Sequence, residues 1–469
     1  MSDDEFRTEQ DSLGEMQVPA DAYWGAQTQR AVENFPISDE VFGRRFVRAL
    51  GVVKKAAARA NADLDLVDEE KADCIADAAD EVIAGEHDDQ FPVDVFQTGS
   101  GTSSNMNANE VISNRATELY GGEIGTREIH PNDHVNYGQS SNDVIPTAMH
   151  VASLEAVEKD VLPALETLHD ALAEKEAEFD DVVKTGRTHL QDATPITLGQ
   201  EFSGYRTQVE KGIARVEDTR ERLGELALGG TAVGTGLNTH PEFPAKAAEY
   251  ISEETGVDFR EADNHFEAQA AHDAMNEAHG ALETVAGSLN KIANDLRLLA
   301  SGPRNGLGEI DQPENQPGSS IMPGKINPVV AEAVNQVHKQ VVGNDAAISA
   351  GAAEGQIDLN LYKPVIAHNF LQSAQLIANG SEVFAEKFVA KLEADREHCA
   401  ERVQQSMALA TALNPAIGYD KASKVAKQAL EEGKTVKEVV VAEGYLSEEE
   451  ADEVLDPAKM TERVILGDD

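Results

Sequence analysis

The sequence predicts a mostly helical, all-α fold built around long packed helices. Apolar residues recur every three or four positions over three long stretches, residues 162–179, 282–299 and 330–348. That spacing places the apolar side chains on one face of a helix, as in helices that pack side by side in a bundle. Alternation of strand and helix patterns, which builds parallel sheets, is missing from the sequence, and this argues against a parallel-sheet fold.

Each stripe keeps helical spacing from end to end. The first stripe comprises Leu162, Leu165, Leu168, Leu172 and Phe179. The second comprises Leu282, Val285, Leu289, Ile292, Leu296 and Leu299. The third comprises Val330, Val334, Val337, Val341 and Ile348. We expect the stripes to lie in a core or a subunit interface, and their Ala-rich surroundings suggest that more than one chain shares the bundle.

The chain divides into three expected domains. Residues 1–139 form an N-terminal domain of short helices and loops, and residues 140–395 form the central domain of long helices. Residues 396–469 form a small C-terminal helical domain, which is interrupted by Pro and Gly at residues 413–419. Ser447 is the expected N-cap of a short acidic helix near the end.

The composition is strongly acidic. The chain has 469 residues with 39 Lys and Arg against 85 Asp and Glu, a formal net charge of −46. Nucleic acid and anionic membranes are therefore poor partners, because both repel such a surface. Hydrophobic residues still make up 41% of the chain and alternate with the acids, so we expect a folded protein with an acid-coated surface, as in halophiles.

Cysteine usage and hydropathy exclude several other classes. Cys74 and Cys399 are the only cysteines, which excludes a disulfide framework, a Cys-rich zinc site and an ordinary iron–sulfur cluster. We expect neither a metal nor a cofactor. The segment Met1–Gln10 is acidic and polar, unlike a signal peptide, and no run of about 18 apolar residues is present. A cytoplasmic protein without a membrane span is the resulting expectation.

The most informative segment is Gly318–Pro328, a Gly- and Pro-rich stretch that reads as a shaped loop. It combines two hydroxyls, a cation and an amide, which are supplied by Ser319, Ser320, Lys325 and Asn327. This mixture of polar groups is not needed in a hydrophobic core. It is needed in a site that binds a small carboxylate and transfers a proton, and such sites concentrate in polar loops between rigid elements.

Two further polar segments lie in the N-terminal part. Thr98–Glu110 is rich in Gly and Ser but departs from the dinucleotide-binding pattern at Ser104, so we expect a turn that offers hydroxyls and N–H groups to a carboxylate. His130 and His134 have a spacing that could hold a metal on a helix, but Pro131 argues against a regular helix there. Residues 138–143 follow with a second run of amide and hydroxyl side chains.

A fourth polar segment surrounds a single histidine. His189 stands among polar neighbours in Gly186–Pro195, including Arg187 and Asp192. A lone histidine is usually structural, but these neighbours favour an acid or base whose pKa is tuned by its surroundings.

Taken in order, these four segments resemble the signature regions of the fumarase/aspartase superfamily and, within it, the cluster-free class II fumarases. The resemblance also covers residues 23–30, 228–238, 300–304 and 417–420, and so runs over nearly the whole chain. It implies a three-domain, mostly helical protomer that assembles into a homotetramer with a twenty-helix core. It also implies active sites that draw residues from three chains.

The resemblance implies a reaction, the reversible interconversion of L-malate with fumarate and water through an aci-carboxylate. By resemblance Ser319 is the base and acts as an alkoxide, His189 acts on the oxygen side through a water, and Glu332 holds the imidazole. The small dicarboxylate substrate would be bound by Ser100, Gly101, Thr102, Ser140, Ser141, Asn142, Thr188, Ser320, Lys325 and Asn327. A dianion needs such a local cluster, because the net charge of the chain repels it.

The family also has a second, non-catalytic dicarboxylate site. Its pattern matches Arg127, His130, Asn132 and Asp133. An equally weighted alternative is that His130 and Asp133 only stabilise their loop.

Three alternatives to the fumarase reaction stay open. Aspartases eliminate ammonia from aspartate on the same scaffold, but carry Gln at the position of His189 and Ala at that of Gly324. Argininosuccinate and adenylosuccinate lyases place a bulkier residue at Gly324. His134, which aspartases also carry, weakens the distinction from aspartase slightly. Some members of the superfamily are structural proteins without activity, so a non-catalytic helical scaffold is the third alternative.

Overall fold

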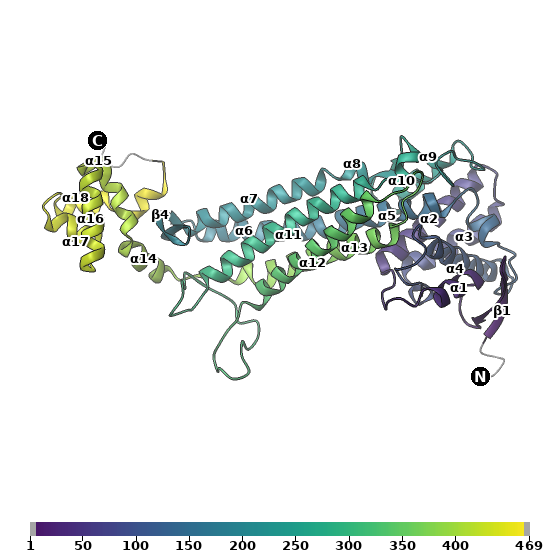
Figure 1. Ribbon diagram of the computed structural model, residues 1–469, viewed down its shortest axis with the longest axis horizontal. Coiled ribbons are helices and arrows are strands. Elements are labelled where there is room, and N and C mark those ends of the chain that lie inside the picture. The colour runs from purple at the N-terminus through teal and green to yellow at the C-terminus, as the bar shows by residue number, and fades with distance from the viewer. Residues whose placement is uncertain (1–5, 464–469) are drawn as a thin grey trace. The chain divides into compact units, whose positions relative to one another are not determined.

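Helices dominate the computed structural model, which describes residues 6–463 (Figure 1). The described residues form two units. Unit 1 contains those of Met1–Pro163, Ile213–Ala286 and His338–Ala378. Unit 2 contains those of Ala164–Gly212, Gly287–Val337 and Asn379–Asp469. Five long helices contribute residues to both units: α6 (Leu162–Glu178), α7 (Leu198–Glu217), α11 (Asp273–Leu299), α12 (Val329–Ala353) and α13 (Lys363–Lys387).

The long helices bury the stripes that the sequence predicts. The ten stripe residues of α6 and α11, and Phe179 directly after α6, are at most 5% exposed. In α12 the stripe is buried at Val334, Val341 and Ile348 and partly exposed at Val330 and Val337. The mostly helical fold class is confirmed. Its physical basis is the burial of one apolar face on each long helix.

Unit 1 also contains a group of helices from residues 26–156 and 220–270, and the longest of them pack against one another. Phe46, Leu50 and Val53 of α2 are at most 1% exposed, and α2 contacts α3 and α5, while α3 contacts α4. The helices of this unit are α1 (Ala26–Asn34), α2 (Arg44–Asp63), α3 (Glu69–Ala84), α4 (Thr102–Tyr120), α5 (Ser141–Ala156), α8 (Arg220–Leu223), α9 (Phe243–Thr255) and α10 (His265–Ala270).

The expectation of short helices in the first third of the chain is wrong. Helices α2 and α4 have 20 and 19 residues. Helix α4 is buried almost all round, with Asn105, Asn107 and Asn109 among its buried side chains. A helix that is buried on every side and carries polar residues lacks the one-sided stripe by which a helix is found in a sequence.

The strands form four two-stranded sheets among the described residues. The pair β5–β6 is parallel and only two residues long, and the other three pairs are antiparallel. The strands are β1 (Phe6–Asp11), β2 (Gly14–Pro19), β3 (Val183–Thr188), β4 (Gln191–Thr197), β5 (Glu225–Leu226), β6 (Arg260–Glu261), β7 (Ile310–Asp311) and β8 (Glu393–Ala394).

Unit 2 contains the hairpin β3–β4 and a small C-terminal group of helices. Leu413, Val425 and Val440 form part of an apolar core of that group. The side chain of Ser447 caps α18 by accepting from the N–H of Glu450, as the sequence predicts. The helices of the group are α14 (Arg396–Gln405), α15 (Asn414–Ile417), α16 (Tyr419–Glu432), α17 (Val436–Ala442) and α18 (Glu448–Val454).

Short 3-10 and π turns connect several of these elements. The 3-10 segments are η1 (Asp88–Gln90), η4 (Val389–Lys391), η5 (Met407–Leu413) and η6 (Pro457–Thr461). The π segments are η2 (Pro131–Val135) and η3 (Val157–Val161).

Candidate active site

In unit 1 the Gly-rich turn leads directly into the start of α4. Ser100 is buried, and its hydroxyl lies 2.9 Å from that of Thr102, the first residue of the helix. Gly101 precedes the helix with a φ of +76°, and a Cβ at this position would lie 2.8 Å from the side chain of Ile145. Glycine is therefore required both for the backbone angle and for the close approach to α5.

The second polar run forms the start of α5. The side chain of Ser140 accepts from the N–H of Asn142 at 3.2 Å, and Asp143 accepts from the N–H of Ser140 at 2.8 Å, which together form a capping box. The amide of Asn142 donates to the carbonyl of Ala232 at 2.7 Å. These bonds set the orientation of three predicted substrate ligands, Ser140, Ser141 and Asn142.

The two turns lie together at neighbouring helix N-termini. Asn105, in the first turn of α4, donates to the hydroxyl of Ser141 at 3.0 Å. Helix N-termini carry partial positive charge and unpaired N–H groups, so they attract carboxylates. Gly101 supplies no capping side chain at α4, and the side chain of Gln97 accepts from the N–H of Ser104 at 3.0 Å in its place. The structure thus brings together Ser100, Gly101, Thr102, Ser140, Ser141 and Asn142.

A buried ionic layer supports the turn of Ser140. Asp143 is buried and also accepts from the N–H groups of Gly229 and Thr231, at 2.9 Å each. Burial raises its pKa to about 6, and the hydrogen bonds oppose that shift. Lys54 is likewise buried and donates to Asn136 and Gln139 at 2.9 Å, while burial lowers its pKa to about 7.

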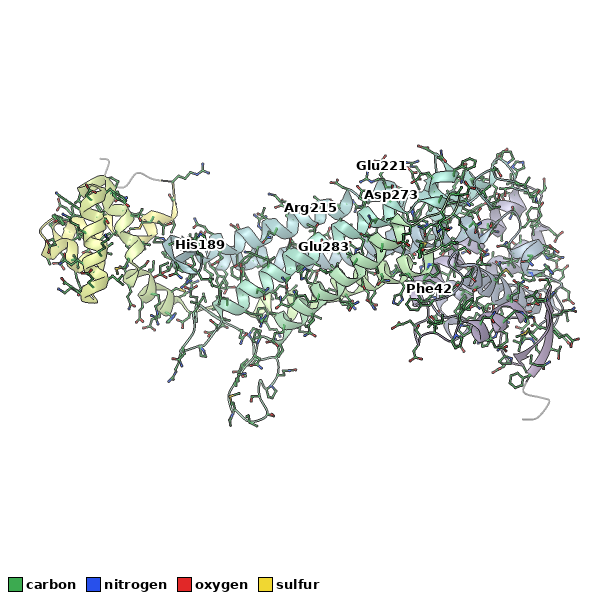
Figure 2. The ribbon with its side chains drawn as sticks, viewed as in Figure 1. Phe42, His189, Arg215, Glu221, Asp273 and Glu283 are labelled. Carbon is green, nitrogen blue, oxygen red and sulfur yellow. The ribbon has the colours of Figure 1, made fainter. Side chains whose placement is uncertain are left out.

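In unit 2 the predicted acid–base histidine stands at the tip of a hairpin. His189 and Leu190 form the two-residue turn between β3 and β4, and Figure 2 shows His189 at that end of the hairpin. Both residues have positive φ, +56° and +58°, as in a type I′ turn. This turn matches the twist of a hairpin, but its two central positions are usually Asn and Gly. An exposed Leu in this conformation is strained, and such strain is often retained at functional sites.

Charged groups hold the body of that hairpin. Arg187 lies 2.7 Å from the carboxylate of Glu309, which is 1% exposed, and Lys184 lies 3.1 Å from the same carboxylate. Lys184 also pairs with Glu201 at 2.7 Å. The exposed pair Thr188 and His189 therefore extends from a rigid base.

The loop that contains Ser319 closes on itself. The N–H of Gly318 donates to the carbonyl of Lys325 at 2.8 Å, and the amide of Asn327 donates to the carbonyl of Gly318 at 2.7 Å. The hydroxyl oxygen of Ser319 accepts from the N–H groups of Ile321 and Met322, at 3.2 and 3.0 Å. Two main-chain donors thus converge on the oxygen of the residue that the family resemblance implies as the base.

The remaining loop residues stay open to solvent. Ser320 and Lys325 are exposed, and Glu332 on α12 lies 3.8 Å from the guanidinium of Arg297. Within the described part of unit 2, no hydrogen bond or ion pair joins His189 to Ser319 or to Glu332. The role assigned to Glu332 stays a prediction.

The residues of the second predicted site lie in unit 1, at η2. His130 Nδ1 accepts from the N–H groups of Asn132 and Asp133 at 3.1 Å each, and Arg127 donates to the carbonyl of Gln10 at 2.5 Å. Asn132 and Asp133 line a cavity of about 720 Å³. No group of metal-ligating side chains occurs among the residues that the structure describes, His130 and His134 included.

Comparison with known proteins decides the family. A family model described as "Lyase" matches residues 14–343, and one described as "Fumarase C C-terminus" matches residues 409–462. A class II fumarate hydratase of Halobacterium salinarum is 82% identical over 470 residues, which cover 100% of each chain. The chain belongs to the class II fumarase family. Its acid-rich composition, which predicts a halophile, agrees with the source of this relative.

Other class II fumarases support the same assignment. The enzyme of Nitrosomonas europaea is 56% identical over 98% of this chain and 100% of its own. A crystal structure of class II fumarase from Schistosoma mansoni superposes with a TM-score of 0.95 at 40% identity, covering 97% of this chain and 99% of that one. A lactonizing enzyme from Pseudomonas putida, 22% identical with a TM-score of 0.71, shares the fold alone.

Two residues that support the candidate site, Asp143 and Lys54, were not singled out from the sequence. Lys54 lies four positions after Leu50 and three before Ala57, so it belongs to the apolar face of α2, where a lysine is unexpected. The position of a lysine on an apolar helical face could have identified Lys54 from the sequence, because buried lysines are rare. Asp143 gave no such signal, because its buried partners come from residues 229–231.

Membrane-spanning helices can be recognised by their length and apolar character. Of the helices in the described part of the chain, none combines the length and the apolar character that crossing a membrane requires.

Proposed function

We propose that this chain interconverts L-malate with fumarate and water, and that Ser319 performs the proton transfer at carbon. The observation that carries this proposal is the pair of main-chain N–H groups, from Ile321 and Met322, on Ser319 Oγ. A serine hydroxyl is a poor base unless its anion is stabilised. Two aligned N–H dipoles supply that stabilisation in the manner of an oxyanion hole.

The Ser319 alkoxide takes a proton from the malate carbon next to one carboxylate, and the electron pair enters that carboxylate as an aci-carboxylate. The pair then returns to form the carbon–carbon double bond, while the bond to the hydroxyl breaks. The hydroxyl leaves as water after it receives a proton on the side of His189, by way of a bound water. Glu332 orients the imidazole.

The substrate carboxylates bind to two kinds of donor. One carboxylate meets the N-termini of α4 and α5 through Ser100, Thr102, Ser140, Ser141 and Asn142, where helix dipoles favour an anion. Lys325 and Asn327 supply a cation and an amide from the Ser319 loop, and Thr188 and Ser320 add hydroxyls. This local positive field offsets the repulsion from a chain of net charge −46.

Assembly completes the site in this proposal. A homotetramer with a twenty-helix core is supported by apolar side chains that remain exposed on the long helices: Leu298 is 40%, Val342 42% and Val383 45% exposed. Each active site then takes residues from three chains, each folded as the domains 1–139, 140–395 and 396–469. A cytoplasmic location is part of the same proposal.

The segment around His130 is the proposed second dicarboxylate site. The hydrogen bonds that His130 Nδ1 accepts keep its proton on Nε2, which can donate to an anion beside Asn132. Arg127 adds a cation, although its guanidinium already donates to Gln10. The alternative, in which these bonds only stabilise the loop, predicts no binding of a dicarboxylate here.

The first experiment is an ultraviolet assay for fumarate in molar KCl, with L-malate and L-aspartate offered in parallel. Fumarate from malate alone is the expected result. Fumarate from aspartate would favour the ammonia-lyase alternative, and no product from either substrate would favour the non-catalytic scaffold.

Two substitutions then test the assigned roles. Ser319→Ala and His189→Asn should each lower kcat by about 100-fold or more, the range typical of a lost acid or base. Size-exclusion chromatography with light scattering should show the same assembly as the unchanged chain. Turnover within tenfold of the unchanged chain in either variant would contradict the role of that residue.

A further inference from the structure

Lys363 stands in an unusual place. It is the first residue of α13 and is 0% exposed. A cation is unfavourable at a helix N-terminus, because the helix dipole is positive there, and burial of a charge adds a further penalty. Burial lowers the pKa of Lys363 to about 7, and the charge of Asp143 opposes that shift. A residue that runs against both preferences needs a compensating role.

The ammonium group of Lys363 points at the candidate carboxylate site. Its Nζ donates to the main-chain carbonyl of Asn142 at 3.1 Å, and this is the one acceptor that the described residues offer it. A lysine ammonium has three N–H donors, so two are left for groups other than protein. Asn142 is itself a proposed substrate ligand at the start of α5.

The segment before Lys363 packs against the other carboxylate turn. The carbonyl oxygen of Leu361 would lie 1.9 Å from a Cβ placed at Gly99, so only glycine fits there. Asn360 holds the segment by accepting from the N–H of Tyr362 at 2.8 Å. Lys363 is therefore fixed where the Gly-rich turn and the turn of Asn142 meet.

Several buried polar atoms without partners lie on residues close to Lys363 or to the loop that binds Asp143. Both ring nitrogens of His272 are buried without a hydrogen-bond partner, as are Thr231 Oγ1 and Gln269 Oε1. The charge of Lys363 acts on His272 and helps to lower its pKa, after the larger effect of burial. Buried polar atoms without partners indicate ordered water or a ligand nearby, because such atoms are costly to leave unsatisfied.

We propose that Lys363 is a positioning residue for the substrate: it fixes the Asn142 turn and places a buried positive charge behind the site of one carboxylate. The inference deepens the proposed function and rests on it for the identity of the dianion. Charge compensation is needed at this point, since Asp143 adds a buried negative charge beneath the same turn. Two lysines, Lys54 and Lys363, offset both that charge and the incoming carboxylate.

Two neutral variants test the charge separately from the hydrogen bond. Lys363→Met removes both, whereas Lys363→Gln keeps an N–H donor for the carbonyl of Asn142. Titration calorimetry with succinate, an unreactive dicarboxylate, gives Kd, and the fumarate assay gives KM and kcat. In both variants we expect Kd for succinate and KM for L-malate to rise about tenfold or more, because both lose the buried positive charge, with a smaller change in kcat. The rise should be larger in Lys363→Met, which also loses the hydrogen bond to Asn142. Lys363→Arg keeps the charge, so its Kd and KM should stay within about threefold of those of the unchanged chain.

The matched control is Lys175→Met. Lys175 is also a buried lysine that donates to a main-chain carbonyl, that of Leu392 at 2.8 Å, but it has no place in the proposed site. Lys175→Met should leave Kd for succinate and KM for L-malate within about twofold of the values for the unchanged chain.

Three results would overturn the proposal. The first is succinate binding in Lys363→Gln equal to that of the unchanged chain. The second is an equal effect of Lys175→Met. The third is loss of the folded assembly in both neutral variants, which would make Lys363 structural. If the unchanged chain binds succinate through Lys363 but turns over no malate, the proposed reaction fails and the role of Lys363 stands.

Discussion

Asp143 accepts the main-chain N–H of Ser140 at 2.8 Å, and through this bond a buried carboxylate sets the turn that presents Ser140 and Asn142. The same carboxylate accepts from residues 229 and 231, so it ties the start of α5 to a distant loop. The geometry of the candidate site depends on this one side chain, which itself has no proposed contact with substrate.

Asp143→Asn should therefore weaken both folding and binding. An amide in place of the carboxylate would turn N–H groups toward main-chain donors and leave one or more unsatisfied, at about 1–3 kcal/mol each. We expect a lower thermal midpoint and a higher KM for L-malate. Unchanged values of both quantities would show that the turn holds without this carboxylate.

The effect of Asp143→Asn should also depend on pH. Burial raises the pKa of Asp143 to about 6, so the stability that this group contributes is fully present below about pH 4 and is lost as pH rises through 6. The difference in midpoint between the unchanged chain and the variant should then be larger at pH 5 than at pH 8. Asp94→Asn is the control. Burial acts to raise the pKa of Asp94, but main-chain donors including Ser38 and Phe96 hold it low, so its difference should stay flat over that range.

Gly101→Ala should destabilise unit 1. The φ of +76° costs a residue with a Cβ about 1–2 kcal/mol, and the added carbon would lie 2.8 Å from Ile145. Urea unfolding measures the loss, with Gly204→Ala as control. Gly204 lies in helix α7 with no atom within 4 Å of a Cβ, so that change should stabilise the helix by about 0.5–1 kcal/mol. If Gly101→Ala and Gly204→Ala changed the free energy of unfolding equally, the backbone angle and the close approach at Gly101 would not explain its effect.

The hairpin turn at Leu190 gives a test of strain. Leu190→Gly relieves a φ of +58° but adds backbone entropy to the unfolded chain, so the net gain should be at most about 1 kcal/mol. Leu190→Val places a β-branched residue in the same conformation and should lower the thermal midpoint. Because that change also displaces His189, the Val variant should lose turnover while the Gly variant keeps it. The reverse order of activities would show that Leu190 has another role.

Salt should control stability. At about 0.1 M salt charges interact over about 10 Å, but at 1 M over only about 3 Å, so a net charge of −46 repels itself far more in dilute buffer. The thermal midpoint should fall steadily as KCl is lowered from molar to millimolar concentration. Sucrose, which strengthens burial without screening charge, should not replace the salt. A midpoint that does not depend on salt would refute the halophile interpretation.

The sequence by itself determined the long helices and the chemical character of the site. Stripes such as Leu165–Leu172 are local patterns, and burial of one helical face follows from them directly. The polar loop of Ser319 and the polar segment around His189 were likewise identified by residue type, because hydroxyl, imidazole and ammonium groups in short Gly-containing segments serve few structural purposes. Family membership then followed from the order of these segments.

Only the tertiary structure decided what holds those groups. The two N–H groups on Ser319 Oγ depend on the turn that the loop adopts. The layer of Lys54, Asp143 and Lys363 depends on contacts between segments up to 221 positions apart, as between Asn142 and Lys363. A sequence pattern records the spacing of neighbours along a helix or strand. It does not record which distant carbonyl a buried ammonium will meet, since that is set when the helices pack.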